Sequence, residues 1–522
     1  SSCCLFELLC FFSQERKMGE QAEGFGPNFR LSRACIPYDE IQFGEQLGQG
    51  AFSNVFAGTC RGIPVAIKVL KKKYLPEKQL EKFKREIEIM EKIAHPNVVS
   101  FYGISFAEDN FLLVTNLMKT DLLTVLFDPQ FKLSNYEKVK IGRDIARGCN
   151  WIHSLGILHR DLKSSNILVE FKGGDFDVRV CDFGLSQVQK NKELMLKDSG
   201  GPRGTINWMA PEVLSSQEFN EKSDVWGFGV VMWELITRKL PFAGLSKEEI
   251  VKLVVDEKKV LKVTTPLESL KKLVNDCLEY DPAMRPSFST LVSALNLCSV
   301  DAAISDPIGR QLWKENFVKE ESGVEESVAW GKFWDSLADF VRSAELSDLF
   351  AHVCLKEMLV KKDKRTNEEL VNILEYGKLL SWFPMQSVRS TMLSSISKLC
   401  ARECFFGEID KDEAERYLDN TTPGTYLIRF SSRPGTFTIS RKTKSKAHDH
   451  TRLTFDKVDG TYTMDGKTYQ SLDAFLEAKS EYLKYPRGGS KFASFLEEDS
   501  NINPYSSDVG AAYSSNIGAD KR

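Results

Sequence analysis

The stretch LHRDLKSSN, residues 158–166, places an acid, a base and an amide close together in a short polar segment. Asp161 is followed two residues later by Lys163, and alternate residues of an extended segment lie on the same side, so both can reach one reacting group. Asn166 adds an amide oxygen, a ligand type that hard cations accept. The segment therefore predicts a site that accepts a proton, neutralises an anion and holds a divalent cation.

Further motifs surround this stretch in a defined order. VAIK ends at Lys68 in a strand pattern, and Glu86 lies on the helix that is predicted to follow, so the two can form an ion pair. DFG begins at Asp182, and APE ends at Glu212. Ahead of them lies a glycine-rich segment whose backbone can approach phosphates closely. Its residues are Leu47, Gly48, Gln49, Gly50, Ala51, Phe52, Ser53, Asn54 and Val55.

These residue types suit phosphoryl transfer, in which charge on the phosphates is neutralised and a hydroxyl is held in line. We expect Asp182 and Asn166 to bind Mg²⁺ through oxygen atoms. We expect Asp161 to accept the proton of the substrate hydroxyl and Lys163 to stabilise the γ-phosphate of ATP. The predicted cofactors are thus ATP and Mg²⁺. The predicted catalytic residues are Asp161, Lys163, Asn166, Lys68, Glu86 and Asp182.

This order of motifs resembles the eukaryotic protein kinases over about half of the chain. The resemblance implies a small strand-rich lobe over a larger helical lobe, with ATP in the cleft. It also implies an ion pair between Glu212 and Arg285, and a role for Asp224 in holding the backbone of the catalytic loop. Ser53 stands where the family often has a third glycine, and we expect little loss because Ser is small. The resemblance adds four ATP-binding residues: Ala66, Thr115, Asn116 and Met118.

The residues around the site favour Ser/Thr as acceptors and leave Tyr open as a second acceptor. Lys163 and Thr205 resemble the Ser/Thr kinases, and Thr205 can bridge Asp161 and Lys163 by hydrogen bonds. WMAPE and residues 224–242 instead resemble the tyrosine-kinase-like group, whose members are Ser/Thr or dual-specificity enzymes. The alternative from a different class is a pseudokinase scaffold that only binds its partners. The complete catalytic set counts against that alternative.

A second constellation begins with GTYLIRFSS, residues 424–432, which reads as a buried strand with Arg429 beside Leu427. A guanidinium in a sheet interior is costly unless an anion meets it. With the flanking segments, the stretch resembles the Src-homology-2 (SH2) domain, and YLIRFS matches the family's FLVRES. The implied partners are tyrosine-phosphorylated proteins, bound by a planar guanidinium. The implied phosphotyrosine-binding residues are Arg429, Lys411, Ser431, Ser432, His450 and Arg452.

This second resemblance has departures and one alternative. Cys404 replaces the usual opening Trp, Thr451 replaces an aromatic residue, and Lys411 stands where an Arg is usual. Phosphotyrosine binding is therefore expected. The family's preference for particular ligand residues next to the phosphotyrosine is not carried over to this chain. The alternative is that Arg429 is buried against a structural carboxylate.

The two constellations and the composition between them predict the domain layout. The fold class is α+β multidomain: a bilobal protein kinase fold, a helical linker, then an SH2 fold with a central antiparallel sheet flanked by two helices. This kinase-first order resembles the SH2-containing kinases of amoebae, the Shk family. Residues 1–17 precede the first methionine, Met18, which leaves open whether they are native. The predicted ranges are 1–40 for an N-terminal extension, 41–297 for the kinase domain, 298–403 for the helical linker, 404–490 for the SH2 domain and 491–522 for a disordered tail.

The overall composition limits the location and the partners. The 522 residues carry 70 Lys and Arg against 73 Asp and Glu, and this near-neutral balance argues against bulk attraction to nucleic acid. Apolar runs are too short to span a bilayer, and the 12 cysteines are scattered without a CxxC pair. We expect a cytoplasmic protein that reaches the membrane periphery only through phosphotyrosine partners. A further alternative is that Tyr505 or Tyr513, once phosphorylated, binds Arg429 of the same chain.

Overall fold

The computed structural model divides the chain into two compact units, with the boundary after Cys298. The structure describes most of the chain but neither of its ends, and several internal segments, among them residues 50–52 and 184–185, also lie outside the described part. The described residues are 35–49, 53–71, 77–107, 110–183, 186–188, 196–197, 205–216, 218–319, 323–341, 344–385, 392–445, 447–456 and 459–499.

The first unit begins with a five-stranded antiparallel sheet and one long helix, α2 (Glu77–Met90). Phe83 and Met90 of α2 are buried in a core that includes Leu113 of the sheet, as the apolar stripe of the helix predicts. The sheet order is β1 (Ile41–Gln49), β2 (Ser53–Cys60), β3 (Ile63–Lys71), β5 (Asn110–Asn116) and β4 (Phe101–Ala107).

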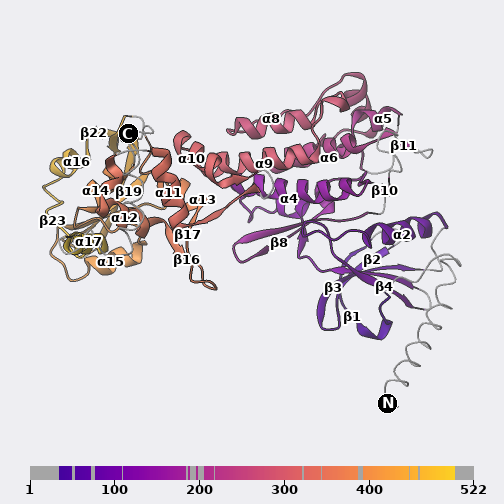
Figure 1. Ribbon diagram of the computed structural model, residues 1–522, viewed down its shortest axis with the longest axis horizontal. Coiled ribbons are helices and arrows are strands. Elements are labelled where there is room, and N and C mark those ends of the chain that lie inside the picture. The colour runs from indigo at the N-terminus through magenta and orange to yellow at the C-terminus, as the bar shows by residue number, and fades with distance from the viewer. Residues whose placement is uncertain are drawn as a thin grey trace, which may run out of the picture. The chain divides into compact units, whose positions relative to one another are not determined.

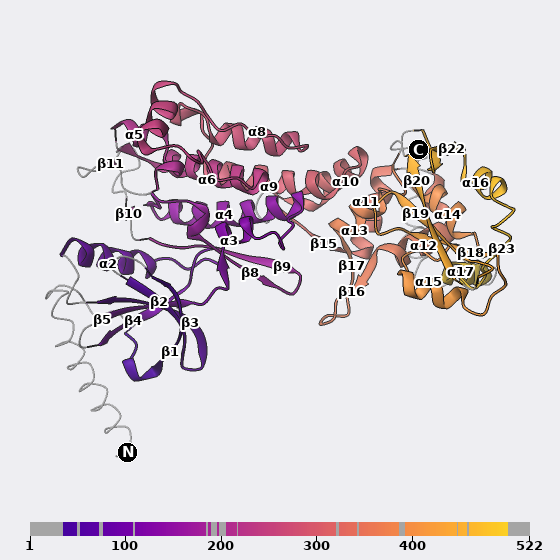
Figure 2. The same cartoon turned by 180° about the vertical axis from the view of Figure 1, so that it is seen from behind.

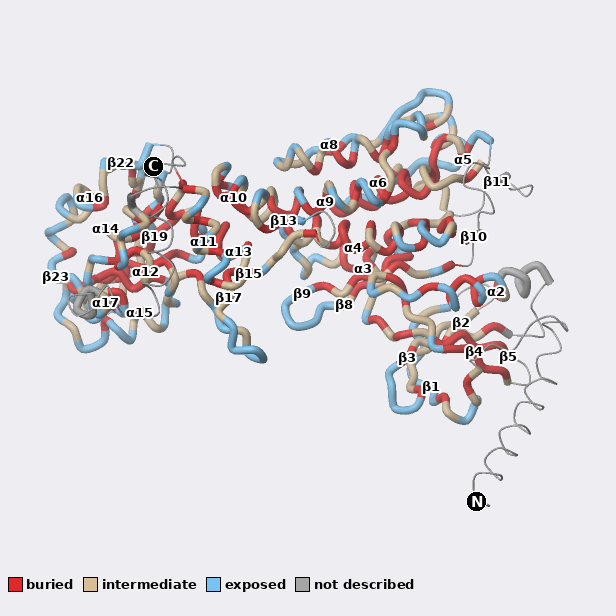
Figure 3. Tube along the Cα trace, viewed as in Figure 1, coloured by how far each residue is buried: buried red, intermediate tan, exposed pale blue. Residues whose placement is uncertain are grey.

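The rest of the first unit is mainly helical, and α4, α6 and α8 lie side by side in it (Figures 1 and 2). Helix α6 is buried along most of its length (Figure 3), which explains its nearly continuous apolar sequence. The helices are α3 (Leu122–Phe127), α4 (Asn135–Ser154), α5 (Pro211–Ser216), α6 (Glu221–Thr237), α7 (Lys247–Val251), α8 (Glu268–Cys277) and α9 (Phe288–Ala303). A small sheet orders β6 (Thr120–Asp121), β8 (Ile167–Lys172) and β9 (Asp175–Val180), and two further pairs join β7 (Ile157–Leu158) to β10 (Gln187–Val188) and β11 (Leu196–Lys197) to β12 (Glu218–Phe219).

The second unit begins with a region that we expected to be helical and that also contains two small sheets. Its core is aromatic: Trp313 stacks on Tyr376 with ring centroids 5.6 Å apart, and Phe333 meets Tyr376 edge to face. The helices are α10 (Pro307–Phe317), α11 (Trp330–Val341), α12 (Leu349–Leu359), α13 (Ile373–Leu379) and α14 (Leu393–Cys400). The strands are β13 (Val318–Lys319) with β14 (Gly323–Val324), and β15 (Ser327–Ala329), β17 (Glu369–Asn372) and β16 (Val360–Lys362) in that order.

The same unit ends with a six-stranded sheet and the helices α15 (Lys411–Leu418) and α16 (Leu472–Ala478). Strand β18 is buried along its whole length, and Leu427 packs against Ala414 and Leu418 of α15. The sheet order is β22 (Lys467–Tyr469), β21 (Thr461–Met464), β20 (His448–Asp456), β19 (Thr436–Lys442), β18 (Thr425–Phe430) and β23 (Tyr485–Pro486).

The expected disorder of the C-terminal segment from residue 491 is corrected for its first nine residues. Lys491–Asp499 form a helix, α17, which contacts α12. Phe492 is 1% exposed and stacks on Phe405 with ring centroids 5.5 Å apart, so burial of an aromatic side chain stabilises the helix. Tyr505 and Tyr513 lie outside the described residues.

In the described part of the chain, the helices are too short or too polar for any of them to cross a membrane.

Candidate functional site

The catalytic-loop residues of the opening stretch converge on one carboxylate. Lys163 Nζ donates to Asp161 Oδ2 at 2.7 Å, and Asn166 Nδ2 donates to the same oxygen at 3.1 Å and to the Asp161 carbonyl at 2.8 Å. Thr205 completes the bridge that its sequence position predicts. Its Oγ1 accepts from Lys163 at 2.8 Å, and its backbone N–H donates to Asp161 Oδ1 at 3.2 Å. Asp161 is thus held in one orientation by three residues.

Asp224 of α6 holds the backbone of this loop, as expected. Its carboxylate accepts from the backbone N–H groups of His159 and Arg160, each at 2.8 Å, and lies 2.9 Å from His153 Nε2. Burial alone would raise the pKa of Asp224, but the hydrogen bonds and nearby imidazoles outweigh burial and lower it. Arg160 adopts φ = 68°, a strained backbone conformation that these two bonds stabilise.

The predicted ion pair between Lys68 of β3 and Glu86 of α2 is confirmed. Lys68 Nζ lies 2.8 and 2.9 Å from the two carboxylate oxygens of Glu86. Burial alone would lower the pKa of Lys68, but the carboxylates of Glu86 and Asp182 outweigh burial and raise it, so the ammonium is retained at neutral pH. The Lys68 ammonium, which is 26% exposed, is thereby held by the buried Glu86 on the side of the site where Asp182 lies.

The expected adenine-pocket residues lie on neighbouring strands. Ala66 of β3 is the cross-strand partner of Thr115 of β5, and Asn116 is fixed because its Oδ1 accepts from the backbone N–H of Ser100 at 2.6 Å. Met118, in the following segment, is buried.

The ends of the glycine-rich segment are paired between β1 and β2. Gly48 faces Val55 and Gln49 faces Asn54 in the register of the two strands. Leu47 and Ser53 also belong to these strands. Gly50, Ala51 and Phe52, the residues between the strands, lie outside the described residues.

The predicted Mg²⁺ ligands come from two adjacent segments. The backbone N–H of Cys181 donates to the Asn166 carbonyl at 3.0 Å, which places Asp182 next to Asn166. Asp182 is exposed and adopts φ = 65°, while the next residue, Phe183, is buried against His159. One carboxylate and one amide oxygen fit a cation that takes its remaining ligands from ATP phosphates and water.

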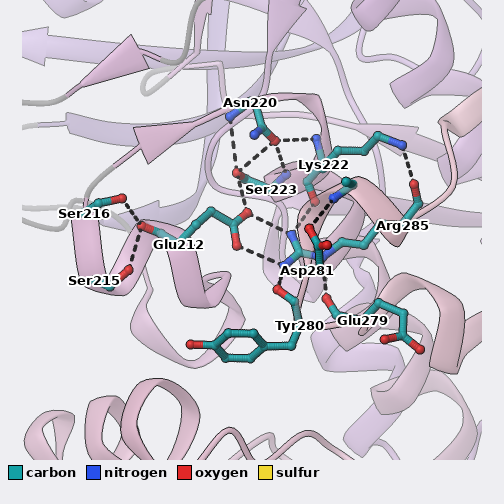
Figure 4. A network of polar contacts seen from close by, with 11 residues as sticks. Glu212, Ser215, Ser216, Asn220, Lys222, Ser223, Glu279, Tyr280, Asp281 and Arg285 are labelled. Atoms are coloured by element: carbon teal, nitrogen blue, oxygen red, sulfur yellow. Dashed lines mark hydrogen bonds and ion pairs between the residues drawn. The ribbon is translucent and has the colours of Figure 1, made fainter.

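Behind the site, Glu212 and Arg285 form the expected ion pair (Figure 4). It is bidentate, with Arg285 Nη1 and Nη2 at 2.8 and 2.9 Å from the two Glu212 oxygens. Arg285 also donates to three backbone carbonyls, and Ser223 Oγ donates to Glu212 at 2.9 Å. The Arg285 side chain is fully buried, and these bonds compensate its desolvation.

The sequence reasoning missed Glu234 of α6. Its carboxylate accepts from Trp208 Nε1 at 2.7 Å and from Ser164 Oγ at 3.0 Å. Glu234 therefore connects the segment just before the APE motif, which contains Trp208, to the catalytic loop, which contains Ser164. Burial raises the pKa of Glu234 to about 7. An acid inside the apolar run VVMWELI was the available signal, because a buried acid in such a run requires hydrogen-bond partners.

In the second unit, Arg429 of β18 is 9% exposed and points to the α15 side of the sheet. Its Nε donates to Ser440 Oγ at 3.2 Å, and its Nη1 reaches only backbone carbonyls at 3.4–3.5 Å. Burial lowers the pKa of Arg429, and the nearby Asp410 carboxylate opposes that effect. Among the ion pairs of the described residues, none includes Arg429, so the geometry does not support the alternative of a structural carboxylate partner.

All six predicted phosphotyrosine-binding residues line one cavity of about 600 Å³. His450 Nδ1 lies 2.9 Å from Ser440 Oγ, and its Nε2 lies 3.0 Å from Glu415. The six are Arg429, Lys411, Ser431, Ser432, His450 and Arg452. A cavity with this many cationic and hydroxyl groups suits a phosphate ester. Its wall also includes Lys378 of α13, which the sequence reasoning missed.

These two sites and their folds define a class, that of protein kinases followed by an SH2 domain. Residues 41–295 match the family described as protein tyrosine and serine/threonine kinase, and residues 404–478 match the SH2 domain. The chain is 36% identical to the dual specificity protein kinase shkC of Dictyostelium discoideum over 462 residues, which cover 84% of this chain and 89% of the relative. It is 35% identical to shkA of the same organism over 490 residues, covering 88% and 91%.

The chain belongs to the Shk family of SH2-containing protein kinases. The similarity to the serine/threonine-protein kinase CTR1 of Arabidopsis thaliana, 35% over 266 residues, covers 50% of this chain and 32% of that relative. Similarity over both domains therefore distinguishes the Shk relatives from CTR1. As in the kinase family generally, ATP and a divalent cation are used.

Proposed function

We propose that this kinase transfers the γ-phosphate of ATP to Ser, Thr and Tyr hydroxyls of proteins to which its SH2 domain binds through phosphotyrosine. The observation that carries the catalytic part is the formed Lys68–Glu86 ion pair at 2.8 Å, which a scaffold that only binds would not require. The Shk relatives named as dual specificity kinases support Tyr as an additional acceptor.

In this proposal the residues of the first site divide the work. Asp161 accepts the hydroxyl proton, and Lys163 holds Asp161 in place and meets the γ-phosphate. Asn166 and Asp182 hold Mg²⁺, which supplies charge neutralisation on the phosphates when bound. Thr205 holds the Lys163 and Asp161 side chains in position through one hydrogen bond to each. We place the protein in the cytoplasm, with its phosphotyrosine partners as the route to the membrane periphery.

The catalytic assignment is tested with radiolabelled ATP and the full chain. Lys68→Ala and Asp161→Asn are expected to lower the rate by at least a hundredfold, because each removes a group that acts in the transition state. Lys272→Ala, on the exposed face of α8, is the control and should leave the rate unchanged. Phosphoamino-acid analysis of the products then reports which hydroxyls are used. A wild-type chain without turnover, and therefore no faster than either variant, would support the scaffold alternative; full turnover in both variants would overturn the roles assigned to Lys68 and Asp161.

The binding assignment is tested separately on phosphotyrosine peptides. Arg429→Lys keeps the positive charge but loses the planar pair of donors, so binding is expected to fall at least tenfold. Lys398→Ala, an exposed change on α14, serves as the control. Binding of Arg429→Lys at wild-type strength would contradict the assignment.

A further inference from the structure

The wall of the phosphotyrosine cavity is not built by the SH2 domain alone. Lys378 of α13 lines the same 600 Å³ cavity as Arg429, although it precedes the matched SH2 range of residues 404–478. Its side chain is 35% exposed, so the ammonium can meet a ligand. A cation from the preceding helical region thus faces the site where a phosphate is expected.

The segment after α13 is packed against the loop that carries Ser431 and Ser432. Trp382 Nε1 donates to the Thr436 carbonyl at 2.8 Å, and the ring centroids of Trp382 and Phe430 lie 4.4 Å apart. A Cβ on Gly435 would lie 3.1 Å from the Ser381 carbonyl, so the two backbones are in close approach. Because Trp382 is 3% exposed, this packing fixes α13 beside the cavity.

Lys378 lies beside carboxylates that line the same wall of the cavity. Glu408 and Asp410 also line the cavity, and both carboxylates would repel a phosphate dianion. Lys378 forms an ion pair with Glu408, and Glu375 lies 3.9 Å away. Lys378 therefore offsets an anion of the wall while presenting donors of its own, since an ammonium can donate to more than one acceptor.

We propose that Lys378 is a phosphotyrosine-binding residue, so that the site is a composite of the SH2 domain and the helical region before it. This inference rests on the proposed phosphotyrosine binding by Arg429. The phosphate of the ligand takes donors from Lys378 on one wall and from Arg429 on the floor. An SH2 fragment that begins at residue 404 lacks one wall of its own pocket.

The test measures binding of a fluorescein-labelled degenerate phosphotyrosine peptide library to the full chain by fluorescence anisotropy. Lys378→Ala is expected to weaken binding about tenfold, and Lys378→Arg to retain it within about threefold, because the charge-assisted donor is kept. Lys356→Ala is the matched control. Its side chain is 36% exposed and pairs with Glu369 at 2.7 Å, but it does not line the cavity.

Charge neutralisation and direct contact are separated by Glu408→Gln. Alone, this change is expected to strengthen binding, because it removes an anion and releases Lys378. Lys378→Ala with Glu408→Gln is expected to bind more weakly than Glu408→Gln alone. Equal binding by these two variants would overturn the direct contact, since the lysine would then act only through Glu408.

Failure of this inference differs from failure of the proposed function. If Arg429→Ala abolishes binding while Lys378→Ala matches the Lys356→Ala control, only the composite site is overturned. If Arg429→Ala binds as wild type does, phosphotyrosine recognition by this pocket is overturned, and the role of Lys378 falls with it. Unchanged thermal melting of Lys378→Ala would exclude misfolding as the cause of weaker binding.

Discussion

At the scale of the residue, Glu234 shows how burial sets the charge of a group beside the active site. It sits inside an apolar helix and accepts hydrogen bonds from Trp208 and Ser164, yet burial raises its pKa to about 7. The folded protein therefore holds a proton on Glu234 at pH values where the unfolded chain, with a pKa near 4.5, has released it. Between these two pKa values, the free energy of unfolding falls as the pH rises.

This sign makes a prediction for Glu234→Gln. Through this group, the free energy of unfolding of the wild type is expected to fall by up to about 3 kcal/mol between pH 4.5 and 7. The variant has no titrating group at this position, so its free energy of unfolding should fall less over the same pH range. Urea unfolding of the full chain at several pH values, followed through the first unit, measures the difference. Glu268→Gln, an exposed change on α8, is the control. Parallel pH profiles for wild type and Glu234→Gln would show that burial does not raise this pKa.

Residue identities predicted much of both sites, because their chemistry depends on a few side chains at short spacing. The Lys68–Glu86 pair, the Thr205 bridge and the roles of Asp224 in the loop were all anticipated and are present as hydrogen bonds. Lys378 was not anticipated, since a lysine on a helix carries no local signal. Its place in the cavity depends on packing between Trp382 and a strand about fifty residues away.

At the scale of the element, the Glu212–Arg285 pair joins α5 to the segment before α9. Replacing Glu212 by Gln leaves a fully buried guanidinium without its counter-ion, which is expected to cost about 3–5 kcal/mol. Loss of the exposed pair in Lys272→Ala, where the side chains are 78% and 41% exposed, should cost less than about 1 kcal/mol. Chemical denaturation of the two variants side by side checks the contrast. Equal losses would mean that the buried pair adds no more stability than a surface pair.

Elements with strong local patterns were predictable, whereas those that depend on distant partners were not. The apolar stripe of α2 and the alternation in β18 specify a helix and a strand directly. Strands β15 and β17 are three and four residues long and pair across more than forty residues of chain, so neither has a periodic signal. Helix α17 begins a polar tail, and the burial of Phe492 against Phe405 is what stabilises it.

At the scale of the whole molecule, the two sites lie in separate compact units, so catalysis and recruitment should be separable by single substitutions. Arg429→Ala is expected to leave kcat and KM unchanged for a short peptide substrate without phosphotyrosine. For a protein substrate that also carries phosphotyrosine, the same variant should raise KM by about a hundredfold with kcat retained, because binding through the SH2 domain raises the effective concentration of the acceptor.

Asp161→Asn is expected to show the reverse pattern, with phosphotyrosine binding retained and turnover lost on both substrates. Steady-state kinetics on the two substrates measures kcat and KM of each variant, and fluorescence anisotropy on the same preparations measures phosphotyrosine binding. A fall in kcat of Arg429→Ala on the plain peptide would show that the second unit acts on the chemical step itself. In that case the pocket would regulate the kinase as well as recruit its substrates, because a group outside the first unit can lower kcat only by changing the state of that unit.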